Sequence, residues 1–124
     1  MEQIVLIMKR KTLAEGLMRK AEGHQAAFHL EPDYERAAET IRRTLASAAL
    51  VEAGEDREVG AAYCLTLCAM LREETPRCKL LLLCSERSET DIQMAVAAKL
   101  DGRIDDFVFY DAGMEYLCSK LLSM

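Results

Sequence analysis

The sequence predicts an α/β domain in which a parallel sheet lies between two layers of helices. Five short apolar runs alternate with five amphipathic stretches along 124 residues, a length that suits a single domain over residues 1–124. The runs are apolar almost throughout, as expected of strands that are covered on both faces. Because strict alternation of strand and helix produces right-handed crossovers, we expect a three-layer sandwich.

The first two apolar runs and their helices carry recognisable boundary signals. Residues 4–8 form the first run, and Thr12-x-x-Glu15 has the spacing of a capping box, which predicts a helix start there. Residues 26–30 form the second and weakest run. Asp33 follows Pro32 and can cap the next helix, whose inner face is predicted to hold Tyr34, Ala37, Ile41 and Leu45.

The third and fourth runs flank the most apolar part of the chain. Residues 48–51 form the third run, which Glu52 closes, and residues 80–84 form the fourth. Between them, residues 58–73 are predicted to form a helix whose apolar residues recur at helical spacing: Ala61, Leu65, Cys68 and Leu71.

The last third of the chain predicts two helices around the fifth strand. Ser88-x-x-Asp91 is expected to cap the fourth helix, and Gly102 lies where a glycine commonly ends one. Residues 107–110 form the fifth run. The final helix carries Met114, Leu117, Leu121 and Met124. Five such units fit the strand order 2-1-3-4-5 of the flavodoxin-like fold.

Composition excludes several classes of function. The net charge is −5 and no basic stripe with aromatics is present, so we expect no nucleic-acid binding. The N-terminal apolar run is too short to cross a membrane and no positive segment precedes it, which predicts a cytoplasmic protein. Five cysteines argue against a disulfide framework. Cys64 and Cys68 lie one helical turn apart, but without a nearby His we expect packing rather than a metal site, and no cofactor.

The segment Gly102-Arg-Ile-Asp-Asp-Phe-Val-Phe-Tyr110 resembles the Gly-Ala-Asp-Asp-Tyr-Leu-Val-Lys segment of response regulator receiver domains, with one extra residue after the glycine. The order, spacing and hydrophobicity of the elements match that family over the whole chain. The resemblance implies a two-component signalling module, not an enzyme, that acts through protein contacts.

The resemblance also assigns positions to the phosphorylation site. It places Met8 and Lys9 where the family has an acidic pair that binds Mg²⁺, and Glu52 where it has the phosphoacceptor Asp. The family's switch residues include a Thr or Ser at the end of the fourth strand and an aromatic in the fifth, which correspond here to Cys84 or Ser85 and to Phe107. At the last switch position, Tyr110 stands in place of the family's lysine.

These replacements change the chemistry that the site can perform. Mg²⁺ prefers oxygen ligands. The Met8 side chain has no oxygen to offer, and the Lys9 ammonium would repel the metal ion. Glu52 near Lys9 or Arg10 would form an ion pair that needs no metal. The acidic residues 55, 56 and 58 are the only cluster that could rescue a cation site. We therefore expect a domain that works without phosphorylation.

The resemblance further implies an output face formed by residues 92–100 and 107–124. Apolar residues in excess of what one helical face can bury predict an interaction site there. The candidate interface residues are Ile92, Val96, Met114, Leu117 and Leu121. The expected partner is another protein, an output domain or a second copy of the chain. A sensor histidine kinase is the implied upstream partner, although the missing acids argue against phosphoryl transfer from it.

Alternative interpretations remain open at this point. Residues 9–11 would also suit a solvated loop, and Glu52 could face solvent. A small flavodoxin-like enzyme or an anion- or cofactor-binding protein is the competing function, but it needs a phosphate-binding loop after the first strand. Residues 8–12 contain no glycine, and only their positive charge would favour an anion. An output domain beyond Met124 is a further alternative.

Overall fold

The computed structural model describes residues 1–54 and 57–124 and contains the predicted sheet. Its five parallel strands lie in the order β2-β1-β3-β4-β5, which confirms the prediction. Their bounds are β1 (Glu2–Ile7), β2 (Ala26–Glu31), β3 (Ala48–Glu52), β4 (Lys79–Cys84) and β5 (Asp106–Phe109). Ile7 pairs with Val51, so the loop after β1 and the last residue of β3 meet at the same edge of the sheet.

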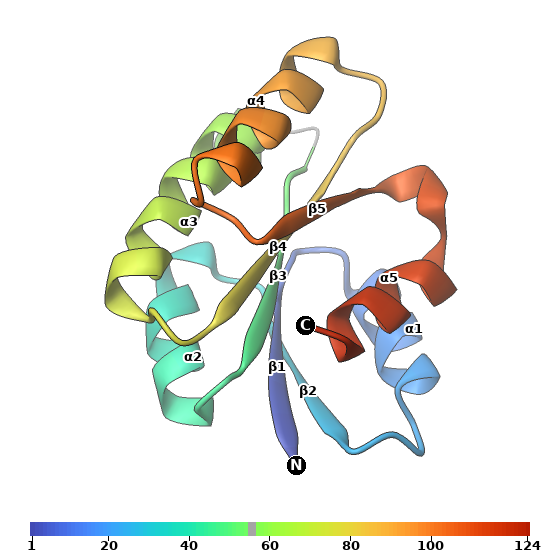
Figure 1. The fold of residues 1–124 in the computed structure, drawn as a ribbon. Helices are drawn as coiled ribbons and strands as arrows, with labels where there is room; N and C mark the ends of the chain where they lie inside the picture. The colour runs from blue at the N-terminus through green and yellow to red at the C-terminus, as the bar shows by residue number, and fades with distance from the viewer. Residues whose placement is uncertain (55–56) are drawn as a thin grey trace.

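Helices cover both faces of the sheet (Figure 1). On one face lie α1 (Lys11–Lys20) and α5 (Met114–Leu122); on the other lie α2 (Ala37–Thr44), α3 (Ala61–Glu74) and α4 (Glu89–Leu100). Short 3₁₀ turns are η1 (Tyr34–Arg36), η2 (Arg57–Val59) and η3 (Tyr110–Ala112). Among residues 1–54 and 57–124, no helix combines the length and apolar character needed to cross a bilayer.

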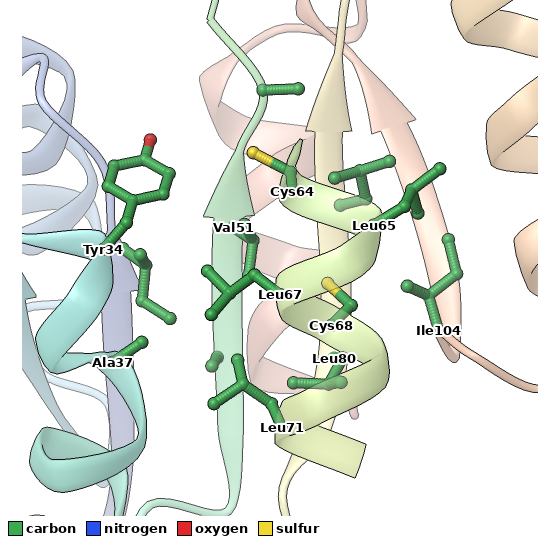
Figure 2. Close-up of a cluster of buried hydrophobic side chains, with 14 of the residues drawn as sticks. Tyr34, Ala37, Val51, Cys64, Leu65, Leu67, Cys68, Leu71, Leu80 and Ile104 are labelled. Atoms are coloured by element: carbon green, nitrogen blue, oxygen red, sulfur yellow. The ribbon is translucent and has the colours of Figure 1, made fainter. Parts of the chain in front are cut away.

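The sheet divides the core into two apolar clusters. Figure 2 shows the larger one, in which Cys64, Cys68 and Leu71 of α3 pack over Val51 and Leu80. Burial raises the pKa of the Cys64 and Cys68 thiols to about 12, so both stay neutral at physiological pH. These cysteines therefore act as small apolar residues of the core.

Several predicted helix boundaries are confirmed, and others are wrong. The Ser88 side chain accepts a hydrogen bond from the Asp91 backbone at 3.2 Å, and Gly102 has a φ of +77° after the end of α4. The capping box at Thr12 is absent, because α1 begins at Lys11 and Thr12 lies inside its first turn. Leu45 does not face the core: it ends α2 in the left-handed conformation and is 85% exposed.

The predicted helix over residues 58–73 also begins later than expected. The structure places η2 over Arg57–Val59, and α3 starts at Ala61 after Gly60. The four residues expected on its inner face, Ala61, Leu65, Cys68 and Leu71, are all buried.

We predict that Leu71→Ala lowers the free energy of unfolding by about 2–5 kcal/mol, because it removes a fully buried side chain and leaves a cavity. Leu100→Ala is the matched control, since Leu100 is 82% exposed, and it should change stability by less than about 0.5 kcal/mol. Urea denaturation followed by circular dichroism measures both. Equal losses in the two variants would contradict this description of the core.

Candidate functional site

A cavity of about 480 Å³ opens at the carboxyl ends of the strands. Ligand crevices of open α/β sheets lie at this edge. The cavity brings together four residues that the sequence assigned to the site: Lys9, Glu52, Ser85 and Tyr110. It is lined by Lys9, Arg10, Tyr34, Glu52, Gly54, Val59, Ser85, Glu86, Arg87 and Tyr110.

The carboxylate of Glu52 lies at the bottom of this site and is paired. Its side chain is only 3% exposed, so the charge needs compensation within the protein. Arg10 donates from Nε to Glu52 Oε2 at 2.7 Å, and the Tyr110 hydroxyl donates to the same oxygen at 2.8 Å. The metal-free ion pair expected for Glu52 is therefore present, and Arg10 rather than Lys9 is its partner. Glu52 does not face solvent.

Arg10 and Tyr110 also contact each other. The Arg10 guanidinium carbon lies 4.5 Å from the centre of the Tyr110 ring, which is a cation–π geometry. Desolvation opposes the charge on Arg10, but the hydrogen bond and the charge of Glu52 outweigh it and raise the Arg10 pKa. Burial, followed by the hydrogen bond to Glu52, raises the pKa of Tyr110, which therefore remains a protonated donor. We call Arg10, Glu52 and Tyr110 the lock cluster.

The backbone of Glu52 is held as well as its side chain. The Tyr34 hydroxyl donates to the Glu52 carbonyl oxygen at 2.6 Å, and Cys64 Sγ lies 3.5 Å from the same atom. Burial raises the pKa of Tyr34, so its hydroxyl keeps the proton that this bond requires. Sequence reasoning placed Tyr34 on the inner face of a helix but missed this contact.

Of the other positions assigned to phosphorylation, Ser85 lines the cavity, whereas Met8, Cys84 and Phe107 do not. Met8 is fully buried in the core beneath α1 and α5, and Cys84 is buried at the end of β4. Ser85 reaches the cavity, where its Oγ accepts a hydrogen bond from the Arg87 backbone at 3.1 Å. Phe107 does not line the cavity; its ring packs beside Phe109 with the centres 5.5 Å apart.

The acidic cluster proposed as a cation site lies partly outside the residues that the structure describes. Residues 55 and 56 lie outside the described residues, and Glu58 is exposed at η2. Within the part of the chain that the structure describes, no three His, Cys, Asp or Glu side chains lie close enough together to hold a metal ion.

The candidate interface residues do not all reach the surface. Leu117 is 3% exposed and Leu121 is 1% exposed, because the apolar side of α5 packs onto the sheet. Their assignment to an interface is therefore wrong. Val96 is 41% exposed, whereas Ile92 and Met114 are partly buried. Leu100 and Tyr116 are large exposed residues on α4 and α5 that the sequence analysis had not selected.

Comparison with solved structures identifies the fold. A receiver domain protein from Methanospirillum hungatei superimposes with a TM-score of 0.77 at 10% identity, over 99% of this chain and 92% of that one. A two-component response regulator from Clostridium difficile superimposes with a TM-score of 0.77 at 20% identity, over 99% of this chain and 94% of that one. A chain described as adenylate cyclase from Rhodopirellula baltica superimposes with a TM-score of 0.81 at 17% identity, over 98% of this chain and 85% of that one.

At these identities the similarity establishes the fold alone. The chain has the fold of response regulator receiver domains, as its sequence resemblance implied. No protein-family model matches the sequence. No curated protein matches it either.

We predict an energetic coupling of about 1–2 kcal/mol between Arg10 and Glu52 in a double-mutant cycle of Arg10→Gln and Glu52→Gln. The reason is that Glu52 is buried and loses its charged partner when Arg10 is replaced. Urea denaturation of the four proteins gives the coupling. The same cycle with Lys9→Gln is the control and should give a value near zero, because Lys9 makes no ion pair with a described residue. A larger coupling for Lys9 than for Arg10 would contradict the assigned pair.

Proposed function

We propose that this chain, which has the fold of a receiver domain, is a signalling module that works without phosphorylation. The observation that carries the proposal is the lock cluster. Arg10, Glu52 and Tyr110 fill the phosphoacceptor position with a cation and a hydroxyl donor that belong to the chain itself.

The chemistry of the cluster supports this proposal. A carboxylate that attacks a phosphoryl group needs a nucleophilic oxygen, usually with Mg²⁺ beside it to neutralise the charge of the incoming group. Here Oε2 of Glu52 already accepts two hydrogen bonds, and Arg10 supplies the positive charge. Met8 has no oxygen ligand to offer, and the Lys9 ammonium repels a second cation. Glu52 is thus better suited to a fixed ion pair than to nucleophilic attack.

The output face has a second charged cluster that ties its elements together. Asp106 of β5 pairs with Lys99 of α4 at 2.9 Å and with Lys120 of α5 at 2.5 Å. Desolvation opposes ionisation, but the hydrogen bonds from Lys120 and Lys99 prevail and lower the pKa of Asp106 to about 2. These pairs hold α4, β5 and α5 in one arrangement.

Exposed apolar side chains on that face would supply the contacts for a partner. Val96 and Leu100 lie one helical turn apart on α4, and Tyr116 is 53% exposed on α5. Large apolar side chains flanked by charges are typical of protein interaction sites. The partner is another protein, an output domain or a second copy of the chain.

Tyr110 would connect the lock cluster to this face. It is the first residue after β5 and begins η3, which leads into α5. Its hydroxyl is bound to the Glu52 carboxylate and lies 3.2 Å from the Ala53 carbonyl oxygen. The lock cluster therefore fixes the start of the segment that carries α5, and it would hold the output face in one state.

We expect that incubation with Mg²⁺ and acetyl phosphate adds no phosphoryl group, because Glu52 is already paired and the metal-binding carboxylates are missing. Intact-protein mass spectrometry measures the modification, with a response regulator known to accept acetyl phosphate as the positive control. A stable gain of one phosphoryl group that Glu52→Gln abolishes would overturn the proposed function.

We predict that Asp106→Asn lowers the free energy of unfolding by about 1 kcal/mol at pH 7, because it removes two partly shielded ion pairs. The pKa of Asp106 falls from 3.8 to about 2 on folding, so its contribution is complete above about pH 5 and is lost as the pH falls towards 2. Urea denaturation of both proteins at pH 7, 5 and 3 measures the difference.

The matched control for this measurement is Asp101→Asn, whose carboxylate is 63% exposed and pairs with Arg103. It should change stability by less than about 0.5 kcal/mol at any of these pH values. A difference between wild type and Asp106→Asn that stays constant from pH 7 to pH 3 would rule out the ion-pair explanation.

A further inference from the structure

We propose that the cavity beside the lock cluster binds a small organic phosphate, held by Lys9, Arg10 and Arg87. The volume of about 480 Å³ falls within the range of small-molecule sites, about 300–1,000 Å³. The cavity is also at the sheet edge where ligands of open α/β folds bind.

Three cationic side chains reach the cavity from two loops. Lys9 and Arg10 follow β1, and Arg87 follows β4. Lys9 and Arg87 are exposed, and neither side chain makes a hydrogen bond or an ion pair with a described residue. Their charges are therefore available to a ligand.

Arg10 retains binding capacity although it pairs with Glu52. The hydrogen bond to Glu52 uses Nε, and the other described side chain that contacts the guanidinium is Tyr110. The Arg10 side chain is 58% exposed, so its terminal nitrogens are open to the cavity. A guanidinium presents two parallel N–H groups that match the geometry of a phosphate.

The balance of charge favours an anion of limited charge. Among the described residues that line the cavity there are two carboxylates, Glu52 and Glu86, and three cations, which together carry a charge of +1. Glu52 is paired with Arg10, and Glu86 Oε2 is shielded without a hydrogen-bond partner among the described residues. The chain as a whole is acidic, with a net charge of −5, which disfavours a polyanion such as nucleic acid.

Uncharged groups in the cavity point to an organic ligand rather than to an inorganic ion. Val59 and the rings of Tyr34 and Tyr110 line it, and they offer apolar surface to a carbon skeleton. The Ser85 hydroxyl oxygen accepts from the Arg87 backbone, which leaves its proton free to donate to a phosphate oxygen.

Binding would compete with the lock cluster. A phosphate on the terminal nitrogens of Arg10 would place a second anion beside Glu52 and weaken the ion pair whose carboxylate oxygen Tyr110 also binds. This regulatory consequence rests on the proposed function, whereas binding itself depends on Lys9 and Arg87, which lie outside the lock cluster.

The test is a titration of the ¹⁵N-labelled protein with inorganic phosphate and with glucose 6-phosphate, in EDTA and at constant ionic strength. We expect saturable shifts of the amide signals of Lys9, Ser85 and Arg87, with glucose 6-phosphate bound more tightly than phosphate. Glucose, which lacks the phosphate group, should cause no saturable shift of these signals. Lys9→Glu and Arg87→Glu should each weaken binding about tenfold, by reversing one charge at the site. Arg77→Glu, an exposed residue outside the cavity, is the matched control.

Each outcome bears on a single hypothesis. Absence of saturable binding for both probes, or unchanged affinity in Lys9→Glu and Arg87→Glu, would overturn this inference while leaving the Arg10–Glu52 coupling intact. Equal loss in Arg77→Glu would also overturn it, because it would show that net charge alone causes binding. Normal binding together with a zero Arg10–Glu52 coupling would instead contradict the proposed function.

Discussion

The burial of one carboxylate at the end of the central strand is the constraint on which the rest of the site depends. β3 lies between β1 and β4 and is covered on both faces, so Glu52 leaves the sheet almost without access to water. A charge in that position must be paired within the protein. Arg10 from the loop after β1 and Tyr110 from the end of β5 meet this requirement. One buried oxygen thereby links three segments that are distant in the sequence.

The two ends of Glu52 are held by different parts of the fold. Tyr110 and Arg10 bind the carboxylate, whereas Tyr34 from η1 binds the carbonyl oxygen. Burial raises the pKa of both tyrosines, and the partner charge raises that of Arg10. All three donors therefore keep their protons throughout the physiological range. The supply of donors to Glu52 is consequently insensitive to moderate changes of pH.

Local signals in the sequence predicted the order of the elements well, because apolar runs and caps depend on neighbouring residues. Ser88 and Gly102 behave as predicted for this reason. Leu117 and Leu121 were misassigned because helical spacing does not reveal how much of α5 the sheet covers. The choice of Arg10 over Lys9 could not be predicted, since both loop residues reach the same edge and only side-chain direction separates them. The hydrogen bond from Tyr34 to the Glu52 carbonyl oxygen could not be predicted either, because it depends on how the sheet places the end of β3 beside η1.

The lock cluster has a consequence for timing under the proposed function. A covalent phosphoryl group persists until it is hydrolysed, so a phosphorylated domain retains a record of its last signal for that interval. An ion pair of which one side chain is 58% exposed re-forms as fast as side chains rotate, within picoseconds to nanoseconds. Such a domain keeps no chemical memory of its own. The duration of its response would be set by the rate at which its partners dissociate.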